Sequence, residues 1–183
     1  FRESGSCFDI EDNIFSGETL PIELSRGCVF KCKFCSFPLL GRKPDDKYLK
    51  EEDCIFNEMM HNYEHFGTTN YLMMCDTFNE STHKLLNINS AMNRFKRETG
   101  ESMRYGAYVR LDLLERFPEQ IEIMGEMGVK ASHFGIESLH YPSAKSVGKG
   151  LKTEKIYRTL EKCRDTWPSD TINVVVPIGV AIA

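Results

Sequence analysis

Three cysteine residues lie close together near the start of the chain, in the stretch SRGCVFKCKFCSFPLLGRK, as Cys28, Cys32 and Cys35. Five basic side chains flank them, namely Arg26, Lys31, Lys33, Arg42 and Lys43. Cysteine thiolates are soft ligands that bind zinc, copper(I) and iron–sulfur clusters. Neighbouring cations can offset the negative charge of a thiolate-bound metal group and tune its reduction potential. The stretch therefore predicts a metal centre in a positively charged loop.

The number of cysteines in the stretch favours one kind of metal centre. A structural zinc site takes four ligands, usually as two separated pairs, whereas no fourth cysteine is adjacent here and the first histidine downstream is His61. Ferredoxin clusters also take four cysteines. A [4Fe–4S] cluster held by three cysteines leaves one iron open, and catalytic metal sites keep such a position for a substrate or cofactor. We expect that cluster, with a structural zinc knuckle as the alternative.

Composition and charge fit a soluble globular protein of one domain. The 183 residues are 41% hydrophobic and 27% charged, with a formal net charge of −4, so nothing global indicates a nucleic-acid binder. No apolar run approaches the length of a membrane span, and residues 1–13 lack the pattern of a signal peptide. The seven cysteines are an odd number. We expect a reducing, cytoplasmic setting with no membrane partner.

The hydrophobic pattern predicts strands and helices in alternation. Strands are expected at residues 19–25, 70–75, 103–110, 130–136 and 171–177. Helices are expected at residues 51–66, 81–100 and 153–167, with one short helix within 113–128. Gly67 and Gly100 are natural helix ends. This order predicts an α/β fold of parallel βα units, a partial (β/α) barrel.

The ends of the chain bear on its domain organisation. We expect residues 1–19 to form a lead segment and residues 20–183 to form the core domain. The chain begins without methionine and stops within an apolar run. These ends predict a piece of a longer protein, with a barrel that is incomplete after the fifth strand.

Polar side chains follow the predicted strands. After the cysteines of the first loop, the later strands lead into Asp76, Asn79 and Glu80, into Arg110 and Asp112, and into Glu137 and Ser138. The carboxyl ends of parallel strands carry the site in such folds, so we expect these groups to share one rim. Alternation also places Gly106 and Tyr108 on one face of the third strand, and His133, Gly135 and Glu137 on one face of the fourth. Small and polar side chains on that face suit a ligand-holding interior.

Several of these side chains also have a purely structural interpretation. Asp76 could cap the helix that follows it, Glu80 could favour the N-terminus of that helix, and Arg110 could pair with Asp112. The basic residues between positions 47 and 97 are expected to lie on solvated helix surfaces. Buried apolar packing is the expectation for three other cysteines, Cys54, Cys75 and Cys163.

The segment CVFKCKFC resembles the CxxxCxxC signature of the radical S-adenosylmethionine (SAM) superfamily, and Phe34 matches its aromatic residue before the third cysteine. The resemblance runs from about residue 20 to the end of the chain. It includes the RGC lead, the acidic loop at 76–80, the R-x-D after the third strand and FGIES…GKG after the fourth. The last of these resembles the branch that contains cobalamin-binding-type radical SAM proteins and tRNA methylthiotransferases.

The resemblance implies an enzyme with a site-differentiated [4Fe–4S] cluster on Cys28, Cys32 and Cys35. In that superfamily the open iron binds SAM, and one electron from the cluster cleaves the sulfonium. The products are methionine and a 5′-deoxyadenosyl radical that abstracts hydrogen from a substrate. The resemblance also implies a reductant such as flavodoxin or ferredoxin.

Roles for the rim residues follow from the same resemblance. The loop with Asp76, Asn79 and Glu80 is expected to contact the SAM amino group. Glu137 and Ser138 are expected to meet polar groups of the ribose or methionine. Arg110 is expected to pair with the SAM carboxylate, and Phe34 to lie near the adenine.

The sequence leaves the substrate open among tRNA, a peptide and a small molecule. Cobalamin is possible as a further cofactor, although no corrinoid-binding domain is visible in this chain. The alternative function is a non-catalytic iron–sulfur or zinc-binding module for electron transfer or structure.

Overall fold

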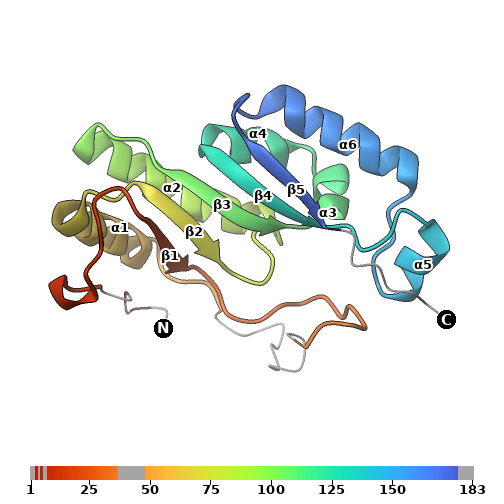
Figure 1. Cartoon of the computed structure of the whole chain (residues 1–183), viewed down its shortest axis with the longest axis horizontal. Coiled ribbons are helices and arrows are strands. Elements are labelled where there is room, and N and C mark those ends of the chain that lie inside the picture. The colour runs from red at the N-terminus through yellow and green to blue at the C-terminus, as the bar shows by residue number, and fades with distance from the viewer. Residues whose placement is uncertain (1–2, 4, 6–7, 37–47, 177–183) are drawn as a thin grey trace.

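A single parallel sheet of five strands organises the computed structural model, which describes residues 3, 5, 8–36 and 48–176. Along the chain the strands are β1 (Thr19–Glu23), β2 (Asn70–Met74), β3 (Arg104–Val109), β4 (Val129–Gly135) and β5 (Ile172–Val176). They lie in the order β1-β2-β3-β4-β5 (Figure 1). Each strand pairs in parallel with its neighbour in sequence. The predicted α/β fold of parallel βα units is thereby confirmed.

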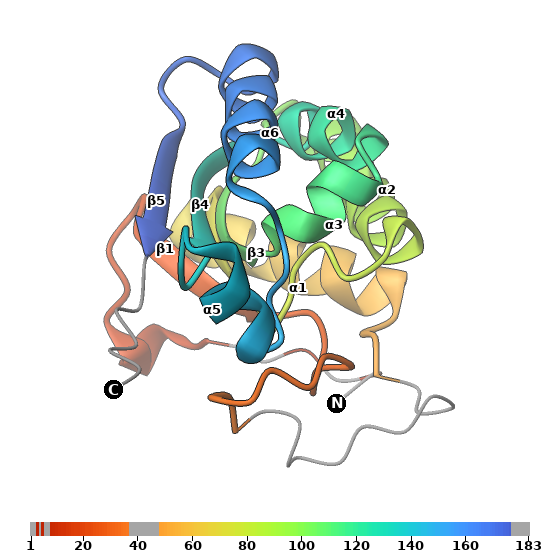
Figure 2. The same cartoon turned by 90° about the vertical axis from the view of Figure 1, so that its right-hand side faces the viewer.

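Helices follow the strands along the chain. They are α1 (Glu52–Phe66), α2 (Thr82–Thr99), α3 (Leu111–Arg116), α4 (Glu119–Glu126), α5 (Tyr141–Ser146) and α6 (Thr153–Thr166), with a short 3₁₀ turn η1 (Ile10–Asp12) before β1. Figure 2 shows α1, α2, α4 and α6 on the same side of the strands. When every crossover between parallel strands has the same hand and leads to the next strand in the same direction, the crossover helices all pack on one face. This is the arrangement in part of a barrel.

Strand alternation separates a covered face of the sheet from an open one. The side chains that point under the helices are buried and form the core, among them Leu20, Ile22, Tyr71, Met73, Tyr105, Ala107, Val109 and Phe134. On the other face Tyr108 lies opposite His133, with ring centroids 5.2 Å apart. Tyr108 remains 47% exposed and Met74 43% exposed. The predicted placement of Tyr108 and His133 on this face is confirmed, whereas β4 ends at Gly135 and does not include Glu137.

Two helices end at the glycines where the sequence predicted their ends. Gly67 ends α1 with φ 64°, and Gly100 ends α2 with φ 78°. Both backbones are left-handed, which glycine adopts without a steric penalty.

Three local predictions are corrected. Residues 113–128 hold parts of two helices instead of one, because Phe117 and Pro118 separate α3 from α4. Helix α5 was not predicted, since six residues are too few to show a helical period. Trp167 was placed on the last helix but lies just beyond it with an extended backbone. The predicted end of the fifth strand, at residue 177, lies outside the described residues.

No helix in the described ranges has both the length and the apolar character needed to cross a membrane.

Candidate functional site

The cysteine loop leaves the carboxyl end of β1 and carries three free, half-buried thiols, Cys28, Cys32 and Cys35. A tight turn brings the Cys35 N–H to the Cys32 carbonyl at 3.1 Å. The Lys33 N–H donates to the Val147 carbonyl at 3.0 Å, which ties the loop to the segment after α5. Figure 2 shows both segments at the same end of the sheet. Of the flanking cations, Arg42 and Lys43 lie outside the described residues.

The chain that returns from the loop is anchored on α1. The Lys50 N–H donates to the Leu24 carbonyl at 2.9 Å, and Leu49 forms an antiparallel bridge with Ser25. The Lys50 ammonium forms a buried ion pair with Glu58 of α1. The expectation that the basic residues between 47 and 97 are solvated is therefore wrong for Lys50. The charge of Lys50 is neutralised inside the protein. Through this ion pair Lys50 holds the segment that follows the cysteine loop against α1.

Arg110 joins the end of β3 to the cysteine loop. Its Nη1 donates to Cys32 Sγ at 3.2 Å, and its guanidinium stacks on the Phe30 ring with 3.9 Å from Cζ to the centroid. Its Nε and Nη2 bind Asp112 as a fork, at 3.0 and 2.7 Å. The structural ion pair with Asp112 is thus present, and it aims the remaining edge of the guanidinium at the thiol.

Asn79 fixes the backbone of Arg110 from the loop after β2. The Arg110 N–H donates to Asn79 Oδ1 at 2.9 Å, and Asn79 Nδ2 donates back to the Arg110 carbonyl at 3.0 Å. Asn79 Nδ2 also donates to Gln120 Oε1 of α4 at 3.2 Å. The Asn79 side chain is fully buried. Its carboxamide therefore couples two of the strand ends that the sequence placed on one rim.

Cys28 faces the same β2 loop on its other side. Its Sγ lies 3.5 Å from the Thr77 hydroxyl oxygen. Below this contact, the Lys84 ammonium of α2 donates to Ser25 Oγ and to the Thr77 carbonyl, both at 2.8 Å. Lys84 is buried, so the expectation of a solvated side chain is wrong here too. The sequence held a signal for it, because Lys84, Ile88, Ala91 and Phe95 share one helix face.

Asp76 does not cap the helix that follows it. Ser81 does so, with its hydroxyl accepting the Lys84 N–H at 3.2 Å. Asp76 accepts a backbone hydrogen bond from Gly27, at the entrance to the cysteine loop. Burial raises the pKa of its carboxyl group, whereas Lys84 opposes that shift. Glu80 is half-buried nearby. Asp76 therefore lies at the predicted rim and does not cap α2.

Glu137 lies buried at the end of β4, with φ 67° in the left-handed region. Its Oε1 is 3.8 Å from Lys149 Nζ, whereas its Oε2 is buried and lacks a hydrogen-bond partner among the described residues. An unpaired buried acceptor costs free energy, about 1–3 kcal/mol.

Ser138 accepts the His140 N–H at 3.1 Å in a local turn. Phe34 is 44% exposed.

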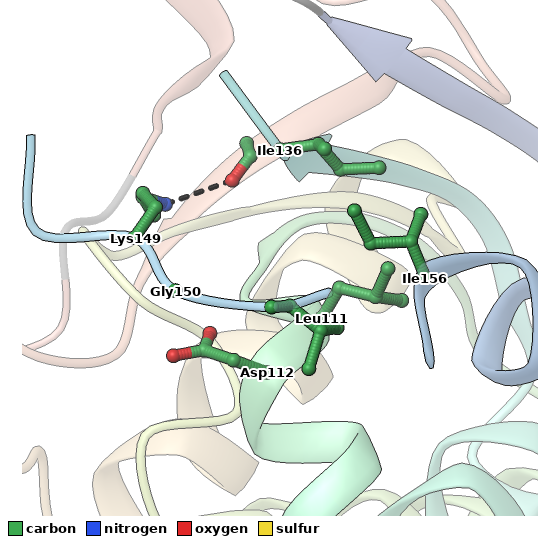
Figure 3. Close-up of a pocket in the computed structure, with 8 residues that line it drawn as sticks. Leu111, Asp112, Ile136, Lys149, Gly150 and Ile156 are labelled. Carbon is green, nitrogen blue, oxygen red and sulfur yellow. Dashed lines mark hydrogen bonds between the residues drawn. The ribbon is translucent and has the colours of Figure 1, made fainter. Parts of the chain in front are cut away.

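Lys149 was not among the predicted site residues. Its Nζ donates to the Gly135 carbonyl at 2.9 Å, the bond drawn in Figure 3. Burial and the nearby Arg110 guanidinium lower its pKa. Lys149, Gly150 and Asp112 edge a pocket of about 280 Å³, counted with the space open to solvent, whose apolar wall includes Leu111, Ile136 and Ile156. The sequence marked its GKG segment only as part of the family resemblance and gave no role to the lysine.

The other cysteines behave as expected in two cases of three. Cys75 and Cys163 are buried, and burial raises the pKa of Cys163 to about 12. A thiol with such a pKa stays protonated and packs as a small apolar group. Cys54 is only half-buried, at the start of α1.

The donor set at the cysteine loop distinguishes between a four-iron cluster and a structural zinc site. In the described ranges, no three side chains of histidine, cysteine, aspartate or glutamate converge on one metal ion. Each cysteine of a four-iron cluster binds a different iron, so its three sulfurs need not converge on one point. Three free thiols in one loop, with Arg110 donating to one of them, fit such a cluster. They do not make the four-ligand set of structural zinc.

The family model of the Radical SAM superfamily matches residues 22–181. Because this match covers most of the chain, the chain belongs to the radical SAM superfamily, as the cysteine signature indicated. Bacteriochlorophyllide d C-12(1)-methyltransferase of Chlorobaculum tepidum is 26% identical over 145 residues, which are 78% of this chain and 30% of that protein.

Solved structures of this superfamily share the fold. The radical SAM methyltransferase TsrM of Kitasatospora setae, with cobalamin and a [4Fe–4S] cluster bound, matches with a TM-score of 0.67 and 17% identity, over 87% of this chain and 30% of that one. The cobalamin-dependent enzyme OxsB, with aqua-cobalamin and SAM bound, matches with a TM-score of 0.64 and 15% identity, over 86% of this chain and 23% of that one. The chain thus spans 30% or less of the length of these proteins.

Proposed function

We propose that this chain is the core of a radical SAM enzyme in which Cys28, Cys32 and Cys35 hold a [4Fe–4S] cluster and the strand ends hold SAM. The observation that carries the proposal is the three-thiol loop at the carboxyl edge of the sheet, with an arginine donating to one sulfur. When bound, the cluster and SAM supply a one-electron cleavage of the sulfonium and a 5′-deoxyadenosyl radical that takes hydrogen from a substrate.

The residues around the loop favour an anionic thiolate centre. Arg110 brings a fixed positive charge to Cys32, and Asp112 and Phe30 hold that guanidinium in place. Hydrogen bonds and cations at a cluster's sulfurs raise its reduction potential. We propose that this contact eases electron entry from a donor of the flavodoxin or ferredoxin class.

The proposed SAM contacts differ in how far their polar atoms are already engaged. Glu137 Oε2 is the strongest of them, because a buried acceptor without a partner can take a hydrogen bond from a ribose hydroxyl or an amino group. Asp76, Glu80 and Ser138 line the same edge, and the exposed ring of Phe34 suits the adenine face.

Asn79 and Arg110 contribute differently. The Asn79 carboxamide is occupied by Arg110 and Gln120, so its contribution is to position Arg110. The Nε–Nη2 edge of Arg110 holds Asp112. A SAM carboxylate would have to bind the hydrogens that remain on the Nη atoms of Arg110.

The test is anaerobic reconstitution of the protein with iron and sulfide. We expect a brown protein with about four irons per chain and a reduced EPR signal that changes when SAM is added. Cys32→Ala should lose the iron, whereas the matched variant Cys163→Ala should keep it. A colourless protein with one zinc contradicts the proposal. A brown protein whose signal ignores SAM supports the non-catalytic iron–sulfur module instead.

Cobalamin-dependent methyl transfer is the second candidate for the whole protein. It is favoured by the comparisons, since the matched TsrM and Chlorobaculum tepidum proteins are methyltransferases and TsrM and OxsB carry cobalamin. No residue of this chain is assigned to cobalamin. Cobalamin content of the anaerobically purified full-length protein tests this candidate, and a full-length protein that binds none contradicts it.

A further inference from the structure

A buried cation lies under the cysteine loop with neutral hydrogen-bond partners. Lys84 is 1% exposed, and its ammonium donates to the Ser25 hydroxyl and the Thr77 carbonyl. Within residues 8–36 and 48–176, no carboxylate oxygen lies within 4.0 Å of this ammonium. Burying a charge without a close counter-ion is costly. Buried charges in proteins are as a rule paired with an opposite charge or bound to a metal.

Neither acidic neighbour of Lys84 is a close counter-ion. Asp76 interacts with Lys84 electrostatically but lies beyond ion-pair distance, and burial raises the pKa of its carboxyl group. Cys75 also interacts with Lys84 through a side-chain hydrogen bond, but it is buried, and burial raises the pKa of its thiol. Lys50, the other buried lysine, has its own carboxylate in Glu58.

Ser25 and Thr77, which accept hydrogen bonds from Lys84, both lead to Cys28. Ser25 precedes it by three residues in the loop entrance, and the Thr77 hydroxyl lies 3.5 Å from its sulfur. One intervening residue, Thr77, therefore links the ammonium to a proposed cluster ligand, and Ser25 links it to the same cysteine through three residues of the backbone. The ammonium also joins the end of β1 to the loop after β2, which carries Asp76.

We propose that Lys84 is a positioning residue for Cys28 and the buried counter-charge of the thiolate-bound cluster. The inference rests on the proposed function, because the anion it requires is that cluster. A four-iron cluster with thiolate ligands is anionic, and reduction adds a further negative charge. A buried cation beside it stabilises the bound cluster and favours its reduced state.

Two neutral variants separate the charge from the hydrogen bonds. Lys84→Gln keeps a donor without a charge, and Lys84→Met keeps the length and removes both. Lys96→Met, at an exposed position of the same helix, is the matched control. Each is compared with the parent protein before and after reconstitution with iron and sulfide, without SAM.

The two forms of the protein should respond in opposite directions. Without the cluster, Lys84→Met should melt at the parent temperature or above it, because a buried charge without a close counter-ion is removed. With the cluster, both Lys84 variants should lose iron to a chelator about fivefold faster or more, since a loss of 1 kcal/mol changes an equilibrium about fivefold. Their cluster potential should also be more negative, while Lys96→Met matches the parent.

Other outcomes overturn the inference in distinguishable ways. If Lys84→Met melts lower by the same amount with and without the cluster, Lys84 is a structural brace only. If Lys84→Gln matches the parent in iron retention and potential, the charge has no role at the cluster. If the parent itself assembles no cluster, the proposed function fails first. A Lys84→Met that does not fold leaves the decision to Lys84→Gln.

Discussion

At the scale of single residues, charges at the cysteine loop are placed by specific partners. Arg110 meets Cys32 because Asp112 holds two of its nitrogens and Asn79 holds its backbone. The two interpretations drawn from the sequence, an ion pair or a ligand contact, are compatible for this residue. Its type and position were predictable, whereas its contact with Cys32, 78 residues away in sequence, was not.

Asp76 provides a prediction about pH. Burial raises its pKa above the ordinary value of 3.8, so its ionised form destabilises the folded state. This destabilisation is absent at pH values below the ordinary pKa of the carboxyl group and develops as the pH rises above that pKa. Asp76→Asn should therefore increase the free energy of unfolding at pH 7, by no more than about 1 kcal/mol because water screens a part-exposed group. At pH 3 the variant and the parent should match. Urea unfolding at both pH values measures this.

Asp170 is the control with the opposite sign. Its hydrogen bond with Lys130 lowers the pKa of its carboxyl group, so its ionised form stabilises the fold above the ordinary value. Asp170→Asn should lower stability at pH 7 and have no effect at strongly acidic pH. Two variants that shift in the same direction contradict the assignment for Asp76.

At the scale of elements, the segment after α5 is built to approach the cysteine loop closely. Gly148 has φ 88°, and a Cβ there would lie 3.2 Å from the Cys32 Cα. Any side chain at this position therefore meets both backbone strain and a contact with the proposed metal loop. Gly100 has a similar φ of 78°, but a Cβ there meets nothing within 4 Å.

These two glycines form a matched pair for mutation. Gly100→Ala and Gly148→Ala should each lower the free energy of unfolding, by about 1–2 kcal/mol for the left-handed backbone. Only Gly148→Ala should also reduce the iron bound after reconstitution, because it displaces Cys32. Urea unfolding and iron analysis measure the two effects. Equal iron content in both variants shows that the approach of Gly148 does not position the loop.

Other elements show what a local pattern can and cannot predict. The helix ends at Gly67 and Gly100 follow from residues that are adjacent in the chain. Helix α5 and the break at Pro118 were missed, since short helices carry few periodic positions. Lys84 was misplaced because charge is a weak guide to burial when the partner is distant in sequence.

At the scale of the whole molecule, helices cover one face of the sheet and leave the other open. Trp167 closes the covered side near β4. It is 4% exposed, stacks on Phe134 with ring centroids 6.0 Å apart, and donates its indole N–H to the Ile121 carbonyl at 2.8 Å. It therefore joins α4, β4 and the end of α6 in one core.

As the single tryptophan of the chain, Trp167 reports on this core. Its emission should shift to longer wavelength at the same urea concentration at which the helical circular dichroism is lost, because one core unfolds cooperatively. Trp167→Phe should lower the free energy of unfolding by about 1–3 kcal/mol, because the hydrogen bond and part of the packing are lost. Tryptophan emission that changes well before the circular dichroism contradicts a single cooperative core.

The sequence by itself determined the order of the five strands and of the long helices α1, α2 and α6, the α/β class and the three cysteines, because each depends on neighbours in the chain. The tertiary structure decided which charges meet those cysteines. Arg110 reaches Cys32 from the end of β3, and Lys84 lies beneath Cys28 from α2. A local pattern cannot specify such contacts, since they arise only when parallel strands bring distant segments to one edge of the sheet.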